Sequence, residues 1–216
     1  MQLTGHEQTS ISNRVAALEA RTGTQVVTAV VGKSDSYPEA PWKAFAIGAG
    51  AAALGCMIWQ FTVGGWDADT TRVGHILAIL GSGAILALLA IVVPRFARVF
   101  IDRVRRETEV TQFARSLYLQ RGLGRTRGRV GILVLVSLFE RNVVILADEG
   151  FDGRVDAPDW SALTRRIAVL LPHYGAAAAL RAGLDAMEAL LLERGYCAGS
   201  SWNELPDAVL QMQVGR

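Results

Sequence analysis

The sequence has 216 residues, of which 51% are hydrophobic and 19% are charged, so a single domain of ordinary size is expected. Its mean hydropathy of +0.28 is high for a soluble protein, and the excess lies between residues 44 and 93. The two cysteines, Cys56 and Cys197, imply no disulfide framework, because the first lies inside an apolar run and the second near the end.

Two elements are predicted before the apolar region. A helix is expected to begin at Ser10 or Ser12, either of which can cap it, and to end at Gly23. The β-branched run from Thr24 to Val31 is typical of a strand. The chain therefore begins with a helix followed by a strand.

Two long apolar runs follow, Ala44–Trp66 and Val73–Val93. At about 1.5 Å per residue, each is long enough to cross a hydrocarbon core of roughly 30 Å. The turn between them contains Gly64, Gly65 and Asp67, which suit an exposed connection. The alternative is a pair of buried helices in a large soluble core, but such runs leave almost no polar face. Residues 43–94 are therefore predicted to form a transmembrane helical hairpin.

Positive charge flanks the predicted hairpin. Residues 95–129 contain ten arginines and three acidic residues, whereas residues 130–216 contain seven arginines and eleven acidic residues. By the positive-inside rule, both long ends of the chain are cytoplasmic. The basic block can lie along an anionic leaflet or continue the second span. Nucleic-acid binding is the rival explanation, but no recognition module accompanies the arginines, so membrane lipid is the expected partner and nucleic acid is not.

The chain after the basic block predicts a helix, two strands and two more helices. The helix ends at Gly122, and the strands are Val130–Phe139 and residues 142–147, both apolar on alternating faces as in doubly buried strands. The short connection favours an antiparallel hairpin. With residues 141 and 142 as its turn, Glu140 would face Val143 and Asp152 would face Gly131.

Two helices are predicted to close the domain, the first capped by Asp159 and ended by Pro172, the second ended by Gly195. The order of elements predicts an α/β fold: a three-layer domain with a short mixed sheet, interrupted by the hairpin. The first strand and the Val130 strand are expected to run parallel, because the helices between them can carry the chain back across the sheet. Residues 1–42 and 95–216 would then form one discontinuous cytoplasmic domain.

Several stretches resemble one known family. The strand "TGTQVVTAVV", the strand pair "RVGILVLVSLFERNVVILADEGF" and the helices that follow are similar to the TPM domain, in a bacterial branch of membrane proteins. The stretch "NELPD", Asn203 to Asp207, is similar to a short acidic-proline tail motif of that branch. The resemblance implies a three-layer TPM-like fold in a bacterial protein. With the two spans and the positive-inside rule, the expected location is the bacterial inner membrane, with both termini cytoplasmic.

For function, the resemblance implies a small α/β domain that is held at a membrane and often acts on another membrane protein. Acid phosphatase activity and calcium binding have been proposed for some members. This chain departs from the more familiar arrangement, an exported domain with a C-terminal span, because its spans interrupt the domain.

Acidic residues cluster after the second strand of the pair. Asp148, Asp152 and Asp156 are the candidate metal ligands, because a hard cation such as calcium needs several oxygen ligands that converge on one point. Their spacing is neither an EF-hand loop nor a phosphatase signature. Alternatively, Asp148, Glu149 and Asp152 form exposed ion pairs, worth about 0–1 kcal/mol each, with the arginines of the preceding loop, Arg125, Arg127 and Arg129.

Two functions follow from these observations. In the first, the hairpin anchors a non-enzymatic module that engages another protein or a second copy in assembly or quality control. In the second, the chain is a membrane-tethered phosphatase or divalent-ion-dependent hydrolase that uses the acids around Asp148, with a divalent cation such as calcium as cofactor. The histidines lie far apart in the sequence and no catalytic set is evident, which favours the first function.

Overall fold

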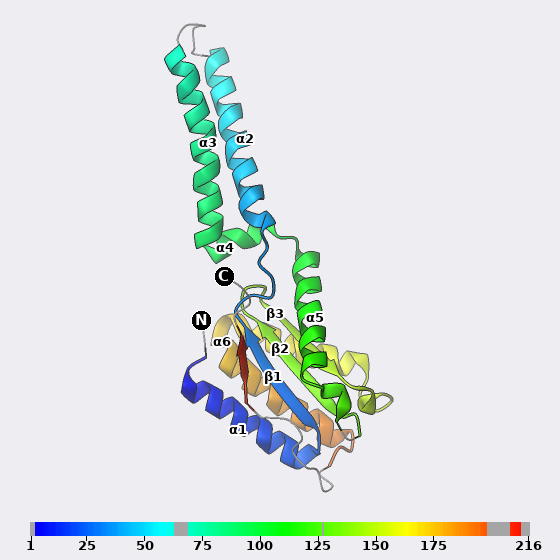
Figure 1. The fold of residues 1–216 in the computed structure, drawn as a ribbon. Coiled ribbons are helices and arrows are strands. Elements are labelled where there is room, and N and C mark those ends of the chain that lie inside the picture. The colour runs from blue at the N-terminus through cyan, green and yellow to red at the C-terminus, as the bar shows by residue number, and fades with distance from the viewer. Residues whose placement is uncertain (1–2, 63–68, 127, 198–207, 213–216) are drawn as a thin grey trace. The chain divides into compact units, whose positions relative to one another are not determined.

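The structure is a computed structural model that describes residues 3–62, 69–126, 128–197 and 208–212. The chain divides into two compact units (Figure 1). One is an α/β unit of residues 1–36 and 107–216, and the other is a helical unit of residues 37–106. The helical unit is wider than the predicted hairpin because it includes the connections on either side of the two long helices.

The first helix, α1 (Gly5–Thr22), begins earlier than predicted. Its cap is Thr4 rather than Ser10 or Ser12, because the Thr4 side chain accepts the backbone N–H of Glu7 while the Glu7 carboxylate accepts the N–H of Thr4. The helix ends as predicted at Gly23, whose φ of 72° is the left-handed conformation that glycine adopts readily.

The sheet has the strand order β3-β2-β1-β4 among the described residues, with β1 (Gln25–Val31), β2 (Gly131–Ser137), β3 (Asn142–Ala147) and β4 (Leu210–Met212). β1 and β2 run parallel and β2 and β3 run antiparallel, so both predicted pairings are confirmed. β4, which pairs in parallel with the other side of β1, was not predicted. The sheet is mixed, and β3 lies at one edge of it.

The register of the β2–β3 hairpin differs from the prediction by four residues. Ser137 pairs with Asn142, so the turn consists of residues 138–141, and Asp148 rather than Asp152 lies beside Gly131. Glu140 explains the difference. Its buried carboxylate accepts the Ser34 N–H at 2.8 Å and the Ser137 hydroxyl, which holds Glu140 in the turn against the strand ends.

Helices cover both faces of the sheet, as the three-layer prediction required (Figure 1). α1 and α6 (Ala157–Glu193) pack on one face, around a core that includes Ile132, Val134 and Leu184. α5 (Arg103–Gln120) packs on the other face through Val110, Ala114 and Leu117. β1 and β2 are buried along their whole length, which accounts for their continuous apolar sequences.

The helix α6 consists of two helical runs, as predicted, but its boundaries differ. Its cap is Asp156, and Asp159 completes a capping box from the third helical position. The break falls at Gly175, with φ 79° and ψ 173°, rather than at Pro172, because only glycine adopts that backbone conformation readily. The second run is tied to α1 by buried Glu188, which pairs with Arg14 and Arg21.

The helical unit is built on α2 (Glu39–Thr62) and α3 (Asp69–Val92), followed by α4 (Pro94–Ala97) and the short 3-10 helix η1 (Arg98–Phe100). α2 and α3 approach closely at Gly48, where a Cβ would lie 2.8 Å from the backbone oxygen of Ser82. The Ser82 hydroxyl donates to the Gly48 carbonyl at 3.1 Å. Small residues and a hydroxyl that bridges two helices are typical of helix packing in membranes. The predicted turn residues Gly64, Gly65 and Asp67 lie outside the described residues.

Three helices of the described part are long and apolar enough to cross a membrane, by length and composition: Glu39–Thr62, Arg72–Val92 and Ala157–Glu193. The third packs against the sheet and α1, and it supplies much of the core of the α/β unit. The first two instead expose large apolar side chains along most of their length, including Leu54, Phe61, Leu77, Leu80, Ile85, Leu88 and Ile91.

Candidate functional site

Asp148 lies where β3 ends and the chain turns toward α6. Its backbone N–H donates to Gly131 O at 3.0 Å, and its side chain is 6% exposed. Oδ1 accepts the N–H of Glu149 at 2.8 Å and lies 3.6 Å from Nε of Arg129, which also forms an ion pair with Glu149. The predicted pairing of Arg129 with these two acids is therefore confirmed, but only the pair with Glu149 is exposed as predicted, because Asp148 is buried. Arg127 lies outside the described residues.

The other oxygen of Asp148 faces Tyr118 and Gly124. A Cβ built on Gly124, in the 3-10 helix η2 (Leu123–Arg125), would lie 3.7 Å from Tyr118 Oη and 3.9 Å from Asp148 Oδ2. Both oxygens are buried. Burial raises the pKa of Tyr118 to about 12, and the negative charge of Asp148 acts in the same direction. The cluster therefore holds a neutral phenol beside a buried carboxyl group.

Tyr118 gives a measurable test of this arrangement. In Asp148→Asn we expect the pKa of Tyr118 to fall below about 12 but to stay above the ordinary value of about 10, because burial remains. Titration of 13Cζ-labelled tyrosines in the full chain by NMR measures this pKa. Tyr196 is the internal control, because its raised pKa follows from burial and from charges other than Asp148. An unchanged pKa of Tyr118 in the variant would contradict the geometry.

The same shift has a consequence for stability. A folded-state pKa above the ordinary value means that the folded chain keeps a proton on Tyr118 where the unfolded chain loses it. The contribution of this group to stability is therefore fully present below about pH 10, and it is lost as the pH rises toward about 12.

The three candidate metal ligands lie in different surroundings. Asp148 is buried, Asp152 is exposed at the end of the 3-10 helix η3 (Glu149–Phe151), and Asp156 caps α6. Among the residues that the structure describes, no group of three histidine, cysteine or acidic side chains could hold a metal ion. The capping role accounts for Asp156 without a metal. A calcium site at these residues stays a prediction.

An open groove of about 690 Å³ runs beside Asp148, between β3 and the first run of α6. Apolar side chains form much of its lining, and the polar groups of Asp148, Asp152 and Arg165 lie along it. The residues that line the groove are Ile145, Leu146, Ala147, Asp148, Phe151, Asp152, Val155, Ala157, Trp160, Ser161, Thr164 and Arg165. The groove brings two of the predicted acids to one surface of the α/β unit.

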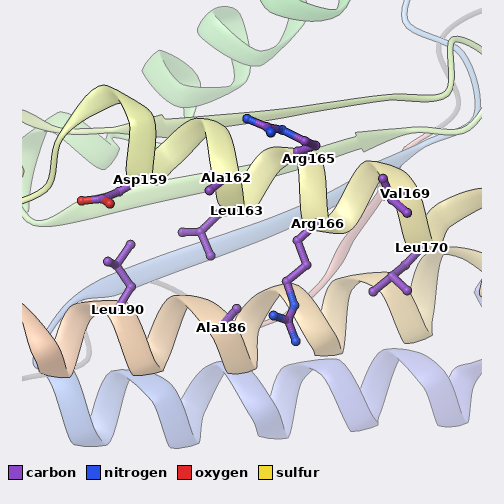
Figure 2. A pocket seen from close by; sticks show the side chains of 9 residues that line it. All are labelled: Asp159, Ala162, Leu163, Arg165, Arg166, Val169, Leu170, Ala186 and Leu190. Carbon is purple, nitrogen blue, oxygen red and sulfur yellow. The ribbon is translucent and has the colours of Figure 1, made fainter.

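A second groove, of about 620 Å³, lies between the two runs of α6 (Figure 2). Its walls are mainly apolar, with Leu163 and Leu170 from the first run and Leu190 from the second. Figure 2 shows the Arg166 side chain extending from the first run toward the second, whereas Arg165 points away. The sequence did not predict this groove, because the way the two runs pack is not visible in their periodicity.

Ser137 gained a partner that the sequence did not reveal. Its hydroxyl donates to Glu140 and lies 3.2 Å from the Ser34 hydroxyl, so a serine and a carboxylate are adjacent. Ser137 is completely buried, and Glu140 is almost so. No substrate reaches a serine in that position, and the cluster therefore joins the ends of β1 and β2 to the hairpin turn instead of forming a catalytic pair.

Residues 93–190 match the family model of the TPM domain, which confirms for that part of the chain the resemblance seen in the sequence. No curated protein matches the chain. The structure is similar to the NMR structure of the BA42 protein from the psychrophilic bacterium Bizionia argentinensis, with a TM-score of 0.58 and 13% identity over 97% of this chain and 95% of that one. At that identity the likeness shows the fold alone.

Proposed function

We propose that the protein is a membrane-anchored, non-enzymatic TPM module whose α/β unit contacts another protein in the assembly or quality control of membrane proteins. The proposal of membrane anchoring is based on the large apolar side chains that are exposed on α2 and α3. In water these side chains would form a far larger apolar patch than soluble proteins expose. In the hydrocarbon core of a membrane these side chains contact lipid, so the free-energy cost of exposing apolar surface to water does not arise.

The charges around the helical unit support an orientation. Lys43 donates to the carbonyl oxygen of Phe100 at 3.0 Å, and Glu39 pairs with Arg105 at 2.9 Å, so the entry and exit of the hairpin are joined by polar contacts. Polar contacts of this kind belong at a membrane surface. With the arginines of residues 95–106, they favour an anionic cytoplasmic leaflet beside this end of the hairpin. Lipid is therefore one proposed partner.

The surface of the α/β unit supports a protein as the other partner. The groove between the runs of α6 has apolar walls, and the positively charged Arg166 side chain extends across it toward the second run. Apolar surface with positive charge at its border suits an acidic segment of another protein. The hydrolase alternative stays a prediction, because Asp148, Asp152 and Asp156 do not converge on a metal site in the described residues.

Reporter fusions test the anchoring and its orientation. We expect a periplasmic reporter to be active when inserted within residues 62–72 and inactive when fused after Arg216, because both ends of the hairpin are proposed to face the cytoplasm. A cytoplasmic reporter should give the opposite pattern at the same two positions. Activity of the cytoplasmic reporter within residues 62–72 would overturn the orientation, and recovery of the chain in the soluble fraction would overturn the anchoring.

A further inference from the structure

The strand β3 has the composition of a central strand but the position of an edge strand. Its sequence, Asn142–Ala147, contains no charged residue and no proline, and four of its last five residues are hydrophobic and partly exposed. Edge strands of soluble proteins are normally protected by charges, prolines or bulges, because an open apolar edge pairs with other chains. The residues of β3 supply none of these devices, so the edge is open to pairing with another strand.

The free side of β3 can be identified from its register. Asp148 donates its N–H to Gly131, so the residues that bond toward β2 are 142, 144, 146 and 148. The backbone groups of Val143, Ile145 and Ala147 consequently point away from the sheet. The N–H of Val143 is met by the Asn142 side chain at 2.8 Å, which leaves Ile145 and Ala147 to form the centre of any new pairing.

The groove beside Asp148 lies along this edge. It is lined by Ile145 and Ala147 of β3 and by Phe151, Val155 and Trp160 on the opposite side. Side chains at positions 143, 145 and 147 belong to the core on the α6 face of the sheet. A strand added beside β3 would therefore place its own alternate side chains in this apolar groove.

We propose that the occupant is β3 of a second copy of this chain, paired antiparallel about a two-fold axis at Ile145. The outward-facing backbone groups limit the pairing to registers in which odd-numbered residues face each other. The proposed register places Ile145 opposite Ile145 of the other copy and Val143 opposite Ala147, so that all three outward-facing residues take part. In the same register Arg141, which precedes β3, would lie at the end of the pairing where Glu149 of the other copy begins η3, so opposite charges would face each other at both ends. Both side chains are exposed. The pairing rests on the proposed function, because it names a second copy as a protein that the α/β unit contacts, at the β3 edge and not at the groove between the runs of α6.

Disulfide trapping tests the register directly. In a full chain with Cys56→Ser and Cys197→Ser, purified in mild detergent, we expect Ile145→Cys to give cross-linked dimer under mild oxidation. Directly opposite residues in a hydrogen-bonded pair have Cα atoms about 5.5 Å apart, within disulfide range. The matched control is Val143→Cys, whose two copies would be about 13 Å apart, four residues along the strand. We expect at least a tenfold difference in dimer yield, whereas mixing Val143→Cys with Ala147→Cys chains should restore the cross-link.

Charge reversal is the second arm. Arg141→Glu should lower the dimer fraction measured by light scattering with the detergent contribution subtracted, and so should Glu149→Arg. The combination of both should restore the dimer, even though Glu149→Arg also removes the ion pair with Arg129. A mere loss of folding would not be rescued in this way.

Three results would overturn the proposal. One is a monomer at about 10 µM with no Ile145→Cys cross-link, and another is a dimer that forms equally well with Arg141→Glu and does not cross-link at position 145. The third is a cross-link from Ile145→Cys to a different protein in cells, without homodimer. That third result would exclude a second copy as the occupant but would not contradict the proposed membrane anchoring. The reporter fusions test the anchoring separately.

Discussion

Replacing Gly150 with valine is expected to destabilise the α/β unit by at least about 3 kcal/mol, the range of severe packing and backbone conflicts. A Cβ at this position would lie 2.6 Å from the carbonyl oxygen of Gly128 and closer still to that of Arg129, and backbone atoms cannot move aside as a flexible side chain can. The substitution would also break the hydrogen bond from Gly150 N–H to Arg129 O, now 2.9 Å. Chemical unfolding of the full chain followed by circular dichroism measures the change.

Gly124→Ala is the matched control, because it lies in the same cluster but has room for a methyl group. Its Cβ would approach the Tyr118 ring at 3.6 Å, an ordinary van der Waals distance. We expect a change of less than about 1 kcal/mol, typical of a tolerated substitution. A change of less than about 1 kcal/mol in Gly150→Val as well would show that the backbone at Gly150 is not closely packed against residues 128–129.

The double variant Ile85→Arg with Leu88→Arg is expected to displace the protein from membranes. These side chains are 62% and 60% exposed on α3, the most apolar of the helices that could span. An arginine at the centre of a spanning helix costs about 2.5–3.5 kcal/mol, so two of them offset much of the insertion energy. The measurement is the fraction of chain that stays with membranes after carbonate extraction.

Trp42→Arg provides the comparison for that experiment. Trp42 is 73% exposed but lies in the first turn of α2 beside Lys43, at the end where positive charge is expected at the membrane surface. The variant should stay in the membrane fraction like the wild type. If the double variant also stays there, the exposed faces of α2 and α3 do not serve as spans.

Local patterns in the sequence were sufficient for most of the architecture. The continuous apolar runs of β1 and β2 predicted strands covered on both faces, and both are buried throughout. The short connection at Arg141 predicted an antiparallel hairpin, which is what forms. These features were readable because each is determined by neighbouring residues and by a single hydrophobic period.

Features that depend on distant contacts were not readable. β4 has only three residues and is stabilised by β1, far away in the sequence, so no local pattern marks it. The predicted register of the β2–β3 hairpin was wrong, because the Glu140 carboxylate accepts the N–H of Ser34, which lies on a segment distant in the sequence. β3 was predicted as a doubly buried strand, since its composition says nothing about which strand lies at an edge.

The candidate site was predicted only in part. Asp148 and its pairing with Arg129 followed from charge and proximity along the hairpin. Tyr118 was missed because its ring reaches Asp148 from α5, on the opposite face of the sheet from α6, and its position in the helix is like that of any amphipathic tyrosine. Asp156 was expected as a ligand, but its capping contact depends on where α6 begins.

The parallel pairing of β1 with β2 imposes an order on biosynthesis. A ribosome makes β1 early, but its partner follows only after residues 32–130, which include both helices of the hairpin. Closing so long a loop costs entropy that no contact offsets until β2 emerges. The apolar strand Gln25–Val31 therefore stays without its partner β2 while α2 and α3 are made, and the sheet is completed only after both long helices exist.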